Sequence, residues 1–370
     1  MLKSTILRSK KNLRCLHQLR SLSTQQLLEI LPAKKTVNRV LYDMNARLTW
    51  KKYLPILKAL YESPDDAIIP KYAKAADLTL FQKVLKEIRT STHQTDKRLL
   101  RLEETLIERS AEMGDNDAVS MLAFSALRDE KMEKFSLDDR NYSKKLIANL
   151  LEIKHPLALK LAGDYAYSKG RIQDAENHYH SFLELDDQSF LASETFKTLG
   201  HISFAKPDLN SAKVYLEKSI NLAPLRKVPE CHFLLGQIYG DDAQRSRYHF
   251  EMSATQGFKE SFAQLGFLEL NYFGNTDKAF EWFKLGVELG DINCLVGCFD
   301  CFVKQERWEQ AHGAMLRIQS FNELREKSGS GAVVDLASIR EKAIAKVMEH
   351  HNIKSQPDVS TGGEGSRWDA

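Results

Sequence analysis

The sequence has few cysteines and no long apolar segment. Its five cysteines in 370 residues show no spacing typical of a disulfide framework, which favours a reducing compartment. The strongest apolar stretch runs from Cys294 to Val303 and contains Asp300, so it falls far short of the ~20 residues that a transmembrane helix needs. We therefore expect no membrane-spanning helix, and any attachment to a membrane should be peripheral or through a partner.

Known catalytic motifs are also missing. The sequence contains no P-loop, no glycine-rich dinucleotide-binding turn after a strand, no H-E-x-x-H and no G-x-S-x-G. Cys294, Cys298 and Cys301 share one helical face, but a structural zinc site needs four ligands, and the local spacing suggests no fourth. Cysteine also serves as a small buried residue at close helix contacts, and we expect that role here. We predict a protein that is not an enzyme and has no cofactor or metal.

Acidic residues are absent from the first 28 positions. The same stretch is rich in Ser and Leu and contains six basic residues: Lys3, Arg8, Lys10, Lys11, Arg14 and Arg20. This composition is typical of a mitochondrial presequence, whereas a basic surface helix of a cytosolic protein is the alternative. We predict a presequence at 1–22, with cleavage near Leu22–Ser23.

Without these six charges, the net charge of the chain falls from +3 to −3. Sequence-independent binding of nucleic acid rests on Lys and Arg that neutralise phosphates. We therefore expect no nucleic-acid partner.

Apolar residues recur with the period of a helix throughout the remainder, and from about residue 97 a longer pattern repeats. Each copy has a small residue, then Leu or Ala four positions later, then Gly or Ala directly after it. The starts are 30 to 40 residues apart, close to the 34 residues of tetratricopeptide repeats. The copies are Ala118-Leu122-Ala123, Ala158-Ala162-Gly163, Thr195-Leu199-Gly200, Cys231-Leu235-Gly236 and Ser261-Leu265-Gly266, with a degenerate one at Cys294.

A second pattern, a small residue four positions before a large apolar or aromatic one, follows the copies at about the length of one helix. Ala175 precedes Tyr179 by four residues, and Ala279 precedes Phe283 in the same way. Small residues are needed where the two helices of a hairpin cross, and large ones fill the layer between hairpins. The copies resemble tetratricopeptide and Sel1-like repeats, which predicts an all-α, right-handed α-solenoid of helical hairpins.

The predicted organisation has five parts. The presequence precedes an N-terminal helical region, in which we expect helices at 36–47 and from Trp50, and a third capped by Asp77. The repeat array, a capping helix and a disordered tail follow. Their boundaries are 1–22, 23–92, 93–320, 321–353 and 354–370.

The first helices of such repeats line a concave face that suits an extended peptide or an amphipathic helix. Outward positions on these helices mix apolar and polar groups, and we predict a peptide-binding groove there. The residues are Lys160, Asp164, Tyr167, Lys197, His201, Phe204, Phe233 and Gln237.

Three blocks, at 28–50, 111–127 and 265–311, resemble one fungal mitochondrial family. Its members act on the matrix side of the inner membrane in export of the C-terminal tail of cytochrome c oxidase subunit 2. The resemblance implies a peripheral inner-membrane location and a role in assembling the oxidase. It also implies subunit 2, an Oxa-type insertase and associated export factors as partners. No residue role is carried over.

Three alternatives remain open. Helical repeats also read RNA, as in mitochondrial translational activators and RNA-processing factors, although the slightly acidic body opposes this. A generic Sel1-like protein–protein adaptor in the cytosol is opposed by the presequence. An enzyme would have only the cysteine face as its centre.

Overall fold

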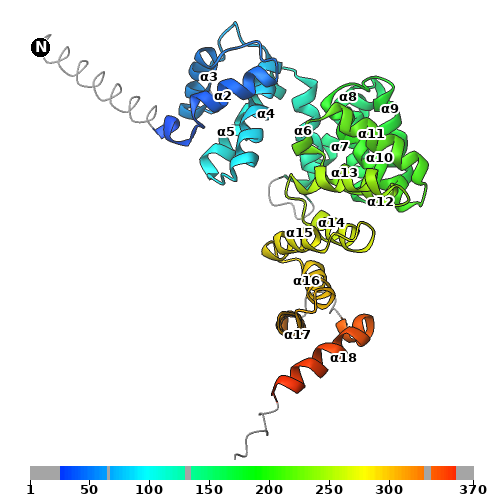
Figure 1. Ribbon diagram of the computed structural model, residues 1–370. Coiled ribbons are helices and arrows are strands. Elements are labelled where there is room, and N and C mark those ends of the chain that lie inside the picture. Colours follow the sequence, from blue (N-terminus) through cyan, green and yellow to red (C-terminus); the bar gives the residue numbers. More distant parts are fainter. Residues whose placement is uncertain (1–25, 65–66, 130–134, 329–334, 356–370) are drawn as a thin grey trace, which may run out of the picture. The chain divides into compact units, whose positions relative to one another are not determined.

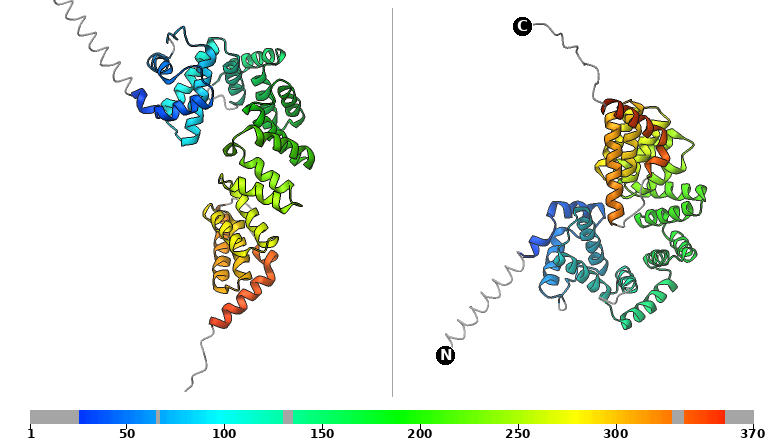
Figure 2. Two further views of the ribbon diagram at one scale, coloured as in Figure 1. Left: turned by 45° about the horizontal axis from the view of Figure 1, so that its top comes forward. Right: turned by 90° about the horizontal axis from the view of Figure 1, so that it is seen from below.

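The computed structural model describes residues 26–64, 67–129, 135–328 and 335–355, and all of their regular elements are helices (Figures 1 and 2). The predicted presequence lies outside these residues, as does the predicted tail from position 356 on. Contacts divide the chain into two compact units, which meet in sequence at Asp186–Asp187. Among the described residues, no helix is long and apolar enough to cross a membrane.

The first unit contains two kinds of helix pairing. Helices α2 to α5 share one hydrophobic core, whereas α6 pairs with α7, and α8 with α9, as hairpins that carry the repeat pattern. The helices are α2 (Lys34–Asp43), α3 (Trp50–Glu62), α4 (Ala75–Thr92), α5 (Lys97–Glu112), α6 (Asn116–Arg128), α7 (Leu137–Glu152), α8 (Pro156–Ser168) and α9 (Ile172–Leu183).

The second unit is a series of hairpins in which each helix packs against the next. The helices are α10 (Phe190–Ala205), α11 (Leu209–Leu222), α12 (Pro229–Ile238), α13 (Ala243–Ala254), α14 (Lys259–Asn271), α15 (Thr276–Glu288), α16 (Ile292–Lys304), α17 (Trp308–Ser328) and α18 (Leu336–Ser355). A short 3₁₀ helix, Leu225–Lys227, precedes α12. The predicted all-α fold of consecutive helical hairpins is confirmed.

The repeated small residues lie where the two helices of a hairpin meet. Every first position of the pattern is fully buried, with no exposed surface at Ala118, Ala158, Thr195, Cys231, Ser261 and Cys294. The glycines that follow pack directly against a large side chain of the second helix, and a β-carbon there would come within 2.7 Å of that side chain. The pairs are Gly163 with Tyr179, Gly200 with Leu216, Gly236 with Phe250, and Gly266 with Phe283.

The N-terminal core is built around aromatic side chains. The rings of Tyr53 on α3 and Phe81 on α4 lie 4.2 Å apart between centroids, and both are buried. The hydroxyl of Tyr53 donates a hydrogen bond to the carbonyl oxygen of Asp77 at 3.1 Å. The one polar atom of this large side chain therefore has a partner inside the core.

Two predicted helix limits were wrong. Helix α2 ends at Asp43 instead of residue 47, because Asn45 takes a left-handed conformation with φ of 51°. Asp77 does not cap α4 from outside: α4 begins at Ala75, and Asp77 occupies its third position. From there its carboxylate accepts a hydrogen bond from the backbone N–H of Lys74 at 2.7 Å.

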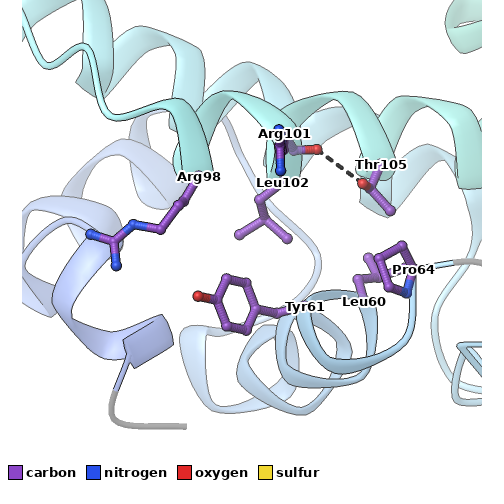
Figure 3. Close-up of a pocket in the computed structure, with 7 residues that line it drawn as sticks. All are labelled: Leu60, Tyr61, Pro64, Arg98, Arg101, Leu102 and Thr105. Carbon is purple, nitrogen blue, oxygen red and sulfur yellow. Dashed lines mark hydrogen bonds between the residues drawn. The ribbon is translucent and has the colours of Figure 1, made fainter. Parts of the chain in front are cut away.

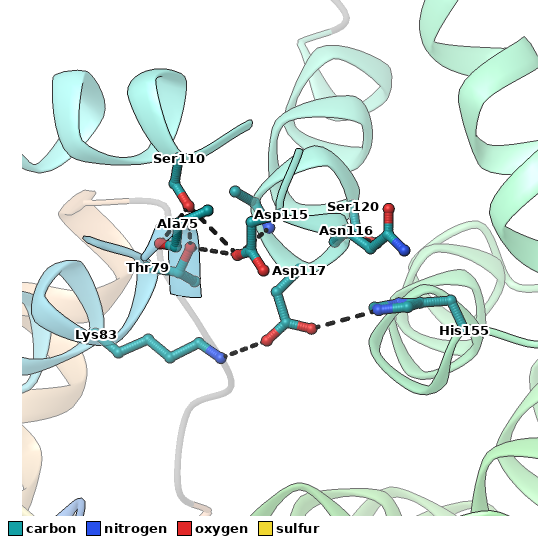
Figure 4. A network of polar contacts seen from close by, with 10 residues as sticks. Ala75, Thr79, Lys83, Ser110, Asp115, Asn116, Asp117, Ser120 and His155 are labelled. Atoms are coloured by element: carbon teal, nitrogen blue, oxygen red, sulfur yellow. Dashed lines mark hydrogen bonds and ion pairs between the residues drawn. The ribbon is translucent and has the colours of Figure 1, made fainter. Parts of the chain in front are cut away.

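A polar network connects α4 and α5 with α6 and with His155 before α8 (Figure 4). Asp115 caps α6 and accepts hydrogen bonds from the hydroxyls of Thr79 on α4 and Ser110 on α5. Asp117 on α6 contacts the ammonium of Lys83 on α4 at 3.0 Å and His155, before α8, at 3.7 Å. These contacts set α6 between α4 and α8 within the first unit.

At the C-terminal end, α18 packs against α16 and α17. Arg340 forms a bidentate ion pair with Asp300 on α16, at 2.7 and 2.8 Å. The rings of Trp308 and His350 stack at 4.5 Å between centroids. The last described helix thus covers the apolar end of the array through both polar and stacking contacts.

Candidate functional site

The predicted groove residues lie on three helices. Lys160, Asp164 and Tyr167 are on α8 in the first unit, and the other five are on α10 and α12 in the second. The two groups therefore belong to different compact units.

The polar residues on α8 bind one another. The ammonium of Lys160 donates to the carboxylate of Asp164 at 2.8 Å, and the hydroxyl of Tyr179 on α9 donates to the same carboxylate at 2.9 Å. Tyr167, one turn later, is 41% exposed. The α8 group therefore offers an aromatic surface beside a carboxylate that already has two internal donors.

On α10 and α12, three charged or polar groups converge. Lys197 and His201 on α10 both approach Glu230 in the first turn of α12, at 3.7 and 3.3 Å. The hydrogen bond from His201 is the main cause that lowers the pKa of the Glu230 carboxyl, although partial burial opposes it. Glu230 was missed at the sequence level, because nothing in its local spacing indicates which neighbour it meets.

The two aromatic residues of the groove on α10 and α12, Phe204 and Phe233, are half-buried. Phe204 and Phe233 pack against one hydrophobic cluster that includes Leu216 and Leu235. The ring of Phe233 also lies 5.2 Å from that of Phe258. Part of each ring thus supports the hairpin layer.

Gln237, the last predicted residue of the groove, is exposed. Its amide offers both a donor and an acceptor, as the backbone of an extended peptide requires. The α10–α12 surface, defined as Lys197, His201, Phe204, Glu230, Phe233 and Gln237, therefore combines hydrogen-bonding and apolar groups. Its binding role stays a prediction.

A cavity of about 240 Å³ lies in the N-terminal region (Figure 3). Its floor is apolar, with Leu60 of α3 and Leu102 of α5 almost fully buried. Arg98 and Arg101, from the first two turns of α5, and Tyr61 of α3 also line the cavity. Asp96 already caps the N-terminus of α5 and forms an ion pair with the guanidinium of Arg98 at 2.8 Å, so both have an anionic partner within the chain.

The three cysteines on α16 are part of the hydrophobic core, as the sequence predicted. Cys294 and Cys301 have no exposed surface, and Cys298 is 6% exposed. Burial raises the pKa of the Cys298 thiol to about 11 and that of the Cys301 thiol to about 12. Among the described residues, no group of three or more His, Cys, Asp or Glu side chains could hold a metal ion.

Comparison with known proteins gives one family. Residues 23–115 match the model of the MSS2 N-terminal domain. Over 310 residues the chain is 34% identical to Protein MSS2, mitochondrial, of Saccharomyces cerevisiae, which covers 81% of this chain and 88% of the yeast protein. Among solved structures, MamA matches 48% of this chain and 98% of its own, with 19% identity and a TM-score of 0.40. The chain belongs to the MSS2 family, and the resemblance drawn from its three sequence blocks is confirmed.

Proposed function

We propose that this protein is a non-catalytic assembly factor on the matrix side of the mitochondrial inner membrane. It assists translocation of the C-terminal tail of cytochrome c oxidase subunit 2, and so contributes to assembly of the oxidase. The observation that carries the proposal is its membership of the MSS2 family, through 34% identity over most of both chains.

The location is supported by one feature of the sequence and one of the relative. The relative is named as mitochondrial, and the first 28 residues have the composition of a presequence. Attachment to the membrane is then peripheral, and an Oxa-type insertase with its associated export factors is the proposed partner there.

The fold supports a binding role. Consecutive hairpins present a row of first helices, and the α10–α12 surface combines a charged cluster with two half-buried aromatic rings. A hydrophilic polypeptide that must be held before translocation can bind such a surface through its backbone and occasional apolar side chains.

The test uses cells that lack this protein. Mitochondrial translation products are labelled, mitoplasts are prepared, and protease is added from outside. We expect subunit 2 to be synthesised while its C-terminal tail stays protected on the matrix side. Normal export and assembly would refute the proposal, and absence of subunit 2 synthesis would favour a translational activator instead.

A further inference from the structure

Helices α15, α16 and α17 line an apolar cavity of about 460 Å³, here called the C-terminal cavity. Phe280 and Val287 of α15 and Leu295, Cys298 and Phe302 of α16 form much of its lining. Sites that hold ligands have volumes of about 300 to 1,000 Å³ and are mostly apolar. The C-terminal cavity is large enough for a bulky side chain of a partner.

The cavity exists because α17 carries small residues, Gly313 and Ala314, on the side that faces α15 and α16. A β-carbon on Gly313 would meet no atom within 4 Å. By contrast, a β-carbon on Gly297 of α16 would lie 2.3 Å from the ring of Phe283. The glycine of α16 permits close packing, whereas the glycine of α17 leaves space unfilled.

The rim of the cavity carries charge. Lys284 and Glu288 of α15 and Gln310 and Arg317 of α17 lie there. Within the described part of the chain, the exposed guanidinium of Arg317 forms no ion pair, and Lys284 reaches only Glu281, at 4.0 Å. The rim thus has two cations and one anion, which favours an occupant with a carboxylate near Arg317.

The apolar surface continues beyond the cavity. Leu324 lies eleven residues after Gly313, about three helical turns, so both face the same side of α17. Its side chain is 66% exposed. An occupant that follows α17 from the cavity would contact this leucine as well.

We propose that the C-terminal cavity binds a segment of the C-terminal tail of subunit 2 and thereby selects where the tail is held. The segment inserts one bulky apolar side chain between α15 and α17 and places an Asp or Glu within a few residues against Arg317. The chemistry of the segment follows from the cavity, and its identity as subunit 2 rests on the proposed function.

The test measures binding of the full chain to fluorescent overlapping peptides that cover the subunit 2 tail. Gly313→Leu fills the cavity, and Arg317→Glu reverses the charge at its rim. Gly313→Ala adds a single methyl group, and Lys346→Glu on α18 makes an equal charge change away from the cavity. We expect peptides with a bulky apolar residue next to an acid to bind. Each of the first two variants should weaken that binding at least tenfold, and the two controls should bind as the wild type does.

Circular dichroism and the urea midpoint verify that each variant is folded before binding is measured. Wild-type affinity in folded Gly313→Leu and Arg317→Glu would overturn the cavity proposal, while the protease experiment on mitoplasts still decides the proposed function independently. Failure of the wild type to bind any subunit 2 peptide would also overturn it. Selective binding of a peptide of residues 356–370 would overturn the choice of partner and assign the cavity to the chain itself.

Discussion

A β-carbon on Gly266 would lie 2.3 Å from a ring carbon of Phe283, in the hairpin of α14 and α15. Phe283 is fully buried and also packs against Gly297 of α16, so its ring is held between two glycines. The ring cannot withdraw from one helix without pressing on the other. Gly266 lies in ordinary helical backbone, which other residues can also adopt. A glycine is therefore required at this position by the packing of Phe283 and not by the backbone conformation.

This relationship predicts the effect of a single methyl group. Gly266→Ala should lower the free energy of unfolding by about 1 to 3 kcal/mol, because overpacking forces the ring or a helix to move. Gly313→Ala is the matched control, since its methyl group enters open space. It should raise the stability by about 0.5 to 1 kcal/mol, as alanine is the better helix former. Urea denaturation followed by circular dichroism measures both, and equal effects would contradict the packing argument.

A buried histidine pair predicts sensitivity to acid. His232 on α12 and His249 on α13 are 6% and 9% exposed, and their Nδ1 atoms lie 3.0 Å apart. Burial, with a smaller contribution from His249, lowers the pKa of His232 to about 4, and burial also lowers the pKa of His249. The surroundings of His249 include Glu217, which favours its charged form, and Arg245, which opposes it.

Because the folded pKa lies below the unfolded value of about 6.5, the unfolded chain binds more protons as the pH falls below 6.5. The pair's contribution to stability is therefore complete above that pH and is lost progressively down to about pH 4. We expect the free energy of unfolding to be about 1 to 2 kcal/mol lower at pH 5 than at pH 7.5 because of this pair. Urea titrations at the two pH values measure the difference. The double variant His232→Gln, His249→Gln should show a smaller dependence, and an unchanged one would exclude the pair as its source.

Removal of the buried carboxylate of Glu269 on α14 is expected to destabilise the protein. Its side chain is fully buried, and its carboxylate contacts Arg247 at 2.8 Å, Lys278 at 3.0 Å and the amide of Asn275 at 2.9 Å. These partners come from α13, α15 and the turn before α15, so one carboxylate links three helices. Removing one partner of a buried ion pair costs about 3 to 5 kcal/mol when the other stays buried.

Arg247 and Lys278 are 25% and 41% exposed, so both cations can reach water after the change. We therefore expect Glu269→Ala to lower the free energy of unfolding by about 2 to 3 kcal/mol, which is less than for an ion pair whose remaining partner stays buried. Glu281→Ala, at a residue whose side chain is 69% exposed, should change stability by less than about 0.5 kcal/mol. Thermal unfolding of the two variants measures the contrast, and similar melting temperatures would show that the buried carboxylate does not hold the helices together.

The repeat pattern can be recognised in the sequence, but the side-chain contacts between separate helices cannot. Buried small residues such as Ala158 and Cys231 could be predicted because the pattern recurs and close helix crossings permit few side chains. The end of α2 could not be predicted, since a left-handed residue at Asn45 interrupts an otherwise favourable helical pattern. The role of Glu230 and the C-terminal cavity could not be predicted for a different reason. Each depends on which side chains two separate helices bring together, and Gly313 in the sequence looks no different from a glycine that permits close packing.

The buried cysteines should react slowly in the folded protein. Burial raises the pKa of the thiols at Cys231 and Cys298 to about 11, and raises that of Cys294 as well. Since the thiolate is the reactive form, the folded chain from Ser23 onward should react with a thiol reagent at pH 7.5 about a hundredfold more slowly than the urea-unfolded chain. Mass spectrometry of alkylated peptides identifies each site. Rapid labelling of Cys294, Cys298 or Cys301 in the folded protein would contradict their packing role and reopen the possibility of chemistry on α16. Slow labelling, together with full export activity of a variant with alanine in place of Cys294, Cys298 and Cys301, would show that these cysteines act as small core residues.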